Sequence, residues 1–115
     1  MENKDIRTIN RILQYIDSIL KYSKNIRSVK EMSNNTMLVE AICFDLLQIG
    51  ELVKDGLTSN TKEKIELIPW HQINGLRNRI VHGYDSIKLD IVYETIKNDI
   101  SLLKKELKKY LKDER

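Results

Sequence analysis

The sequence predicts an all-α fold, an up-down bundle of about four main helices with one additional short helix. Apolar residues recur at three- and four-residue steps near both ends of the chain, which is the period of an amphipathic helix. No segment alternates apolar and polar residues as a half-buried strand does, and the 115 residues include only four glycines and one proline. The hydrophobic content of 41% favours one compact domain over residues 1–115.

Two long helices are expected in the first half of the chain. The first is predicted over residues 3–28, where isoleucine and leucine recur at helical spacing among polar residues. The second, from Met37 to Val53, is apolar nearly all round, which predicts a buried central helix. Residues 33–35 offer polar side chains that can cap its start, and Gly56 is expected to end it.

The second half of the chain is expected to begin with a short helix around residues 62–67. Pro69 suits the first position of the next helix, predicted over about residues 70–81. Gly83 follows directly, where a left-handed residue commonly ends a helix. Asp90 can cap a final long helix whose apolar stripe runs to the end of the chain.

Composition and charge exclude several classes of protein. A net charge of +3, from 20 Lys and Arg against 17 Asp and Glu, is too small to establish a nucleic-acid partner by itself. Cys43 is the single cysteine, so no disulfide within the chain and no zinc site of several thiolates is expected. No segment resembles a signal peptide or is apolar enough to cross a bilayer. These features predict a cytoplasmic protein that does not contact the membrane.

Residues 76–85 gather the groups that phosphodiester chemistry needs. They include two arginines, an asparagine, one of only two histidines, and a tyrosine. The guanidinium of Arg77 can bind a phosphate through its planar fork and stabilise extra charge in a transition state. The imidazole of His82 is suited to proton transfer near neutral pH. Together these groups are typical of metal-independent RNA cleavage, in which a base takes the 2′-hydroxyl proton and an acid protonates the leaving oxygen.

Helix geometry limits how these groups can meet. Asn78 and His82 are four residues apart and share a helix face, whereas Arg77 and His82 diverge by about 140° on a straight helix. Arg77 and His82 can converge only if the helix turns at His82, which Gly83 would permit. A second proton-transfer group is also needed, and His71 lies about 16 Å away along the axis. Two copies of His82 facing each other in a homodimer would supply it.

A purely structural interpretation of the same residues stays open. In it, His82 caps the helix, Arg77 pairs with Glu51 or Asp45, and Tyr84 fills core space. The lysines near the end of the final helix can equally complement the helix dipole or contact an RNA backbone. No pair of metal-ligand residues with the usual helical spacing is present, so no metal site is expected.

Four segments carry a resemblance to a known family, the HepT-like branch of the HEPN superfamily. These are Gln48-Ile49-Gly50-Glu51, Ile68-Pro69-Trp70, Leu76 to Tyr84, and Asp90 to Ile96. The resemblance covers nearly the whole chain, and its motif is Arg, four residues, His, any residue, Tyr. It implies a single HEPN-like domain that forms a homodimer with a composite cleft on the two-fold axis. It also implies a ribonuclease that cleaves RNA without a metal, acting as the toxin of a type VII HEPN/MNT toxin–antitoxin system.

The same resemblance implies a role for each site residue. Arg77 and His82 match the catalytic pair, Asn78 matches a supporting polar residue, and Glu51 is expected to orient Arg77. The implied partner is an MntA-type minimal nucleotidyltransferase antitoxin, which transfers AMP from ATP to the tyrosine that matches Tyr84. The chain itself would need no cofactor, since ATP serves only the partner. The alternative is a non-catalytic helical module that binds, or is modified by, such a nucleotidyltransferase.

Overall fold

The computed structural model describes residues 3–83 and 87–114, and every regular element in these ranges is a helix. The elements in chain order are α1 (Lys4–Tyr22), α2 (Val29–Ser33), α3 (Thr36–Gly56), α4 (Ser59–Lys64), α5 (Trp70–His82), α6 (Leu89–Glu94), the π-helical turn η2 (Thr95–Asp99) and α7 (Ile100–Asp113). The helices α6, η2 and α7 follow one another without a break. The all-α prediction is confirmed, with four long helical segments in the described part of the chain.

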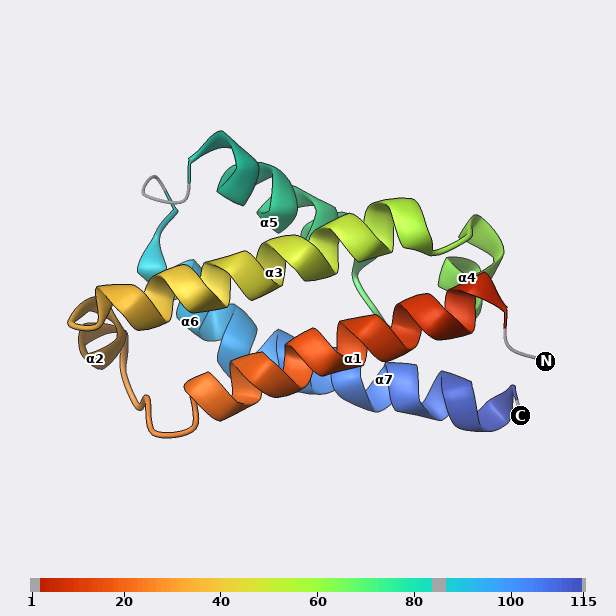
Figure 1. Cartoon of the computed structure of the whole chain (residues 1–115), viewed down its shortest axis with the longest axis horizontal. Coiled ribbons are helices and arrows are strands. Elements are labelled where there is room, and N and C mark those ends of the chain that lie inside the picture. Colours follow the sequence, from red (N-terminus) through yellow and green to blue (C-terminus); the bar gives the residue numbers. More distant parts are fainter. Residues whose placement is uncertain (1–2, 84–86, 115) are drawn as a thin grey trace.

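Helix α3 lies at the centre of the arrangement. It packs against α1 on one side and α5 on the other, and α1 packs in turn on α7. Figure 1 shows α5 at the outer edge of the bundle, running beside α3 in the opposite direction. No described helix has a stretch long and apolar enough to cross a membrane.

The core is built from the apolar stripes that the sequence predicts. Four isoleucines of α1, residues 9, 12, 16 and 19, are completely buried. They join α3 and α7 through side chains such as Ile42, Ile49 and Leu107. Burying each such side chain contributes about 1.5–3 kcal/mol, so this stripe is a main source of stability for the bundle.

The first helix is shorter than its periodicity predicts. The expected helix over residues 3–28 ends at Tyr22, and Ser28 instead caps the separate helix α2. Its hydroxyl oxygen accepts a hydrogen bond from the Glu31 amide at 3.1 Å, which satisfies a donor that a helix start leaves open. The cap therefore outweighs the apolar residue Ile26, whose spacing continues the earlier pattern.

Other expected boundaries move by only a few residues. Asn35 caps α3 by accepting from the Leu38 amide at 3.0 Å, and α3 ends at Gly56 as predicted. The short helix α4 begins and ends about three residues earlier than expected. Pro69 occupies the capping position of α5 rather than its first turn. Asp90 lies inside the final helix, which begins at Leu89.

A buried carboxylate fastens the start of α1 to α4 and α7. Asp5 accepts hydrogen bonds from the Thr58 amide at 3.0 Å, from the Thr58 hydroxyl at 2.6 Å, and from the Thr61 hydroxyl. The Thr61 hydroxyl also lies 3.3 Å from the phenol oxygen of Tyr110. Burial alone would raise the pKa of Asp5, but these hydrogen bonds favour the charged form and hold the pKa below its ordinary value.

Candidate active site at the contact of α3 and α5

Arg77 lies where α5 comes closest to α3. A Cβ atom added to Gly50 would lie 2.5 Å from the Cβ and 2.7 Å from the Cγ of Arg77. Only glycine at this position of α3 leaves room for the aliphatic stem of the arginine. The Gly50-Glu51 step therefore has a physical explanation, because the glycine admits Arg77 and the next residue binds it.

The guanidinium of Arg77 is held from two sides. Its Nε donates a hydrogen bond to Glu51 Oε1, and its Nη1 donates to Asn78 Oδ1 at 2.8 Å. The Arg77 side chain is only 19% exposed, so it has little freedom to leave this position. A guanidinium has five N–H donors, and three of them stay available for a phosphate. The structure thus places Glu51 in contact with Arg77, one of the two pairings that the sequence left open.

His82 is the last residue of α5 and is exposed to solvent. Gly83 ends the helix with φ 140°, a conformation that favours glycine, and its amide donates to Ile80 O at 3.2 Å. The turn that could bring His82 towards Arg77 thus comes after His82 and leaves His82 on the helix. No hydrogen bond within the described residues joins these two side chains.

In one chain, the candidate site residues therefore lie on two different faces of α5. Asn78 and His82 share the exposed face, while Arg77 points towards α3, as expected from about 100° of rotation per residue. Tyr84, the residue that matches the modified tyrosine, lies outside the described residues.

Asp45 was the other candidate partner of Arg77, and the structure assigns that contact to Glu51 instead. The Asp45 carboxylate is buried, and its Oδ2 has no hydrogen-bond partner in the described structure. Burial raises the pKa of this carboxyl, because desolvation disfavours the charged form.

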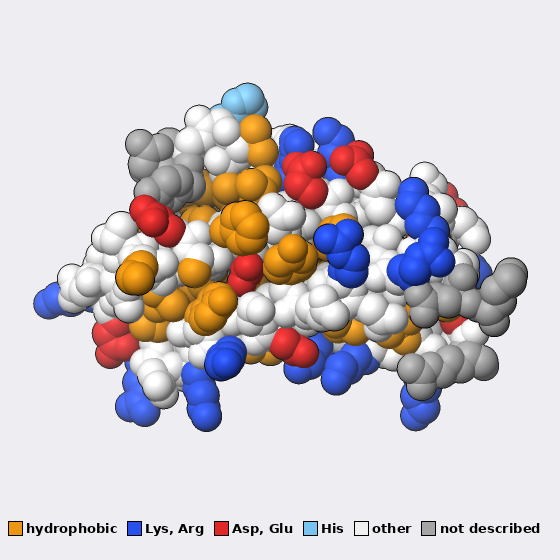
Figure 2. Space-filling view, in the orientation of Figure 1, with side chains coloured by type: hydrophobic (Ala, Val, Ile, Leu, Met, Phe, Trp, Pro, Cys, Tyr) orange, Lys and Arg blue, Asp and Glu red, His pale blue; other side chains and the backbone are white. Residues whose placement is uncertain are grey.

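An exposed apolar stripe on α3 corrects the prediction of a helix buried all round. Met37 is 78% exposed and Phe44 is 56% exposed, and with Glu51 they recur at seven-residue steps along one face. Val81 on α5 is also an exposed apolar residue, at 51%. Figure 2 shows apolar side chains gathered over this part of the molecule. Exposed apolar surface of this kind is typical of an interaction site.

A well-formed cavity lies elsewhere in the described structure, not at this cluster. It has a volume of about 490 Å³ and lies between α3, α5 and the final helix, and neither Arg77, Asn78 nor His82 lines it. Asn78 and His82 are exposed on α5, and Arg77 is partly buried beside them. Among the described residues no group of three His, Cys, Asp or Glu side chains could hold a metal ion.

The sequence is similar to a known family along most of its length. The model of the family described as "Ribonuclease HepT-like" matches residues 12–110. A protein of Methanocaldococcus jannaschii named "Putative RNase MJ1216" is 34% identical over 114 residues, which cover 98% of this chain and 93% of the relative. "Putative RNase TTE0752" of Caldanaerobacter subterraneus subsp. tengcongensis is 32% identical over 93% of this chain and 94% of its own length. "Probable ribonuclease HepT" of Thermococcus cleftensis is 30% identical over 64 residues, 56% of this chain and 57% of the relative.

No solved structure matches the chain significantly. The family model spans most of the chain and includes both Arg77 and His82. The chain therefore belongs to the HepT-like ribonuclease family.

Proposed function

We propose that this protein is a metal-independent ribonuclease whose active cleft forms between two copies of the chain. The observation that carries the proposal is the state of Arg77, a guanidinium held by Glu51 and Asn78 with donors still free for a phosphate. Such prior orientation is what stabilisation of a charged transition state requires, since no reorganisation is then needed during the reaction.

The second copy is needed to complete the chemistry. Each chain offers one imidazole near this cluster, at His82, whereas cleavage with both a base and an acid uses two. The exposed apolar side chains of Met37, Phe44 and Val81 would give a two-fold contact a surface to bury. A homodimer built on this surface would bring two sets of Arg77 and His82 into one cleft.

In that cleft the reaction would be an internal transesterification. One neutral imidazole takes the proton of a 2′-hydroxyl, and the oxygen attacks the adjacent phosphorus. The bond from phosphorus to the 5′-oxygen breaks, and the second, charged imidazole protonates that oxygen. The products are a 2′,3′-cyclic phosphate and a 5′-hydroxyl. Arg77 would bind the non-bridging oxygens, whose negative charge increases at the pentacoordinate stage.

The experiment is cleavage of labelled RNA by the purified protein in the presence of EDTA. Replacing His82 by alanine is expected to reduce the rate by about 10²- to 10⁴-fold, the usual contribution of a proton-transfer group. The exposed position of His82 predicts little change in unfolding by urea. Cleavage at the full rate by the folded variant would remove His82 from the mechanism.

The biological role we propose is that of a toxin in a type VII HEPN/MNT toxin–antitoxin system. Tyr84 follows His82 by two residues, so AMP attached to its phenol would add bulk and negative charge beside the cleft. Like charges would then repel the RNA phosphates. Incubation with an MntA-type nucleotidyltransferase and labelled ATP, followed by mass analysis of the protein, tests this role. AMP on Tyr84 without RNase activity before or after modification would favour the non-catalytic module instead.

A further inference from the structure

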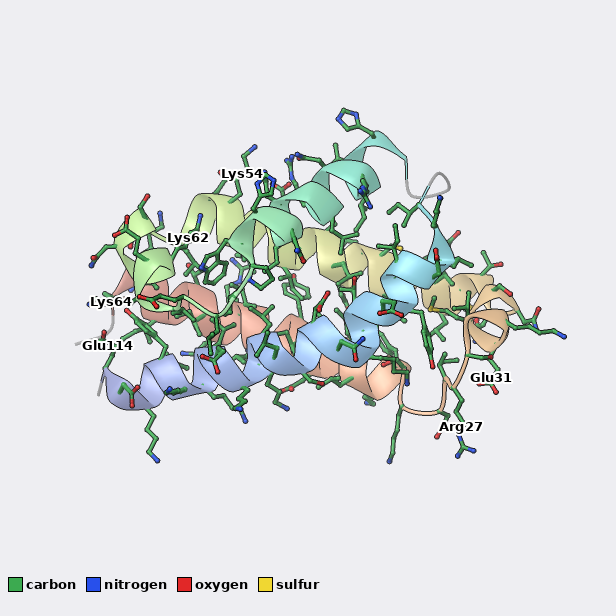
Figure 3. All side chains as sticks on the ribbon, turned by 180° about the vertical axis from the view of Figure 1, so that it is seen from behind. Arg27, Glu31, Lys54, Lys62, Lys64 and Glu114 are labelled. Carbon is green, nitrogen blue, oxygen red and sulfur yellow. The ribbon has the colours of Figure 1, made fainter. Side chains whose placement is uncertain are left out.

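A small hollow at the start of α5 has the groups that bind single-stranded nucleic acid. It has a volume of about 320 Å³ and is lined by Val53, Lys54, Lys62, Trp70, His71 and Asn74. These residues come from the end of α3, from α4 and from the first turns of α5. Figure 3 shows Lys54 and Lys62 at the same end of the molecule, near the start of α5.

The positive charge of this hollow is not neutralised within the protein. Neither Lys54 nor Lys62 has a carboxylate within ion-pair distance in the described parts of the chain, whereas the nearby Lys64 is paired with Glu114 at 3.3 Å. Asp55 and Glu63 follow these lysines in sequence but do not line the hollow. Two free ammonium groups beside an imidazole and an amide can contact successive phosphates of a strand.

Trp70 gives the hollow a stacking surface. Its indole Nε1 donates a hydrogen bond to the Lys62 carbonyl oxygen at 3.0 Å, which fixes the ring between α4 and α5. The ring is half-buried and still lines the hollow. A base can stack on such a fixed aromatic ring whatever its sequence, as in other single-strand binding sites.

A line of polar side chains connects the hollow to the proposed cleft. His71, Asn74, Asn78 and His82 follow each other at steps of three, four and four residues, so they share one face of α5. All four are exposed. The two histidines are eleven residues apart, about 16 Å along the helix, which is about five nucleotides of a stacked strand at about 3.4 Å each.

The other side of α5 would repel the same strand. The larger cavity there is lined by three carboxylates, of Asp90, Glu94 and Asp99, against the single guanidinium of Arg79, and His71 lies between it and the hollow. The π-helical turn between Glu94 and Asp99 adds a residue to the usual turn, so the two side chains line the same cavity although they are five apart. Charge therefore directs a phosphate backbone to the side of α5 that carries Lys54 and Lys62.

We propose that this hollow is an RNA subsite, which binds the phosphates and one base of a single strand a few nucleotides from the bond that is cleaved. The inference rests on the ribonuclease function proposed above and adds to it a requirement on substrate length. An RNA long enough to reach the subsite binds more tightly than a dinucleotide, which can occupy only the cleft.

The test measures binding of fluorescently labelled RNA by anisotropy in the His82→Ala background, where cleavage is suppressed. The double variant Lys54→Ala/Lys62→Ala is expected to bind a single-stranded 12-mer about tenfold or more weakly, and to lose about 1.4 from the slope of log affinity against log salt. Its matched control is Lys21→Ala/Lys24→Ala, which removes the same charge from exposed positions in the last turn of α1 and just beyond its end. The control is expected to bind as the background protein does.

A second measurement uses the single tryptophan of the chain as a local probe. The 12-mer is expected to quench the fluorescence of Trp70 on saturation, and a saturating dinucleotide is not. Equal loss of affinity in both double variants, or 12-mer binding without a change in Trp70 fluorescence, would overturn the subsite. If the wild-type protein nevertheless cleaves RNA, the ribonuclease proposal survives that result. A wild-type protein that neither binds nor cleaves RNA would overturn both proposals.

Discussion

Replacing Gly50 by alanine changes stability and RNA cleavage through different physical effects, which can be measured separately. The added methyl would lie 2.5 Å from the Cβ and 2.7 Å from the Cγ of Arg77, closer than two carbon atoms can approach. These atoms belong to the base of the arginine side chain and cannot swing away as its tip could. Helix α5 must therefore shift, or the stem of Arg77 must leave its rotamer.

The expected loss of stability is small because two terms oppose each other. Alanine is favoured over glycine inside a helix by about 1 kcal/mol. Overpacking at a close contact costs about 1–3 kcal/mol. The net destabilisation is then about 0–2 kcal/mol, which a domain with about 5–15 kcal/mol of stability survives. Urea unfolding followed by circular dichroism measures this term.

The expected loss of cleavage is much larger. A displacement of about 1 Å in a positioned catalytic group can cost about 10²-fold in rate. Gly50→Ala should therefore reduce RNA cleavage by about 10²-fold or more while the protein stays folded. Gly75→Ala is the matched control, because a Cβ there meets no atom within 4 Å. That variant should gain up to about 1 kcal/mol and keep its activity. A Gly50→Ala protein that cleaves RNA at the wild-type rate would refute the proposed role of the α3–α5 contact.

Three further changes test assembly and the buried carboxylates. Phe44→Glu should leave the fold intact, because the side chain is 56% exposed, but should produce monomers in analytical ultracentrifugation and abolish cleavage. Its control is Leu67→Glu, at a position that is 67% exposed and away from the stripe. A Phe44→Glu variant that stays dimeric and active would contradict the proposed dimer. Asp5→Ala should destabilise the fold by about 1–3 kcal/mol, since it leaves the buried Thr61 hydroxyl and the part-buried Thr58 hydroxyl without their carboxylate acceptor. The pKa of Asp5 is lowered in the folded state, so the contribution of this carboxylate to stability is complete above its unfolded pKa of about 3.9. The contribution is lost as the pH falls through the folded pKa, so the stabilities of wild type and variant should converge in strong acid. Asp45→Asn should act in the opposite sense and stabilise the fold by about 1 kcal/mol at pH 7, because the raised pKa of Asp45 makes ionisation in the folded state unfavourable. That gain should disappear below about pH 4 in urea titrations, and a gain independent of pH would show that charge is not its cause.

The sequence predicts those parts of the fold that depend on local patterns. Helical spacing places α1, α3 and α5, and the polar residue Asn35 and the glycine Gly56 mark the ends of α3 because caps act within one turn. The network of Asp5 could not be predicted, since its threonine partners are more than fifty residues away in the chain. No local pattern carries information about a contact of that separation.

The exposed face of α3 escaped prediction for a different reason. Met37 and Phe44 have the same spacing and chemistry as core residues, so a hydrophobic pattern cannot distinguish a face that packs within the chain from one that packs on another chain. Sequence reasoning left Glu51 and Asp45 as alternative partners of Arg77, and the family resemblance favoured Glu51. Only the packing of α5 on α3 decides between them.

In the proposed dimer, assembly and the orientation of Arg77 would be connected through the seven-residue steps of α3. Glu51 lies two turns beyond Phe44 on the same face, and its side chain is 36% exposed in the single chain. A dimer that buries Phe44 would also exclude water from the neighbouring Glu51–Arg77 pair. Charge interactions strengthen as the local dielectric falls, so the guanidinium would be held more firmly and would interact more strongly with a phosphate. The second copy would therefore supply the missing imidazole and, in the same step, increase the electrostatic effect of the arginine already in place.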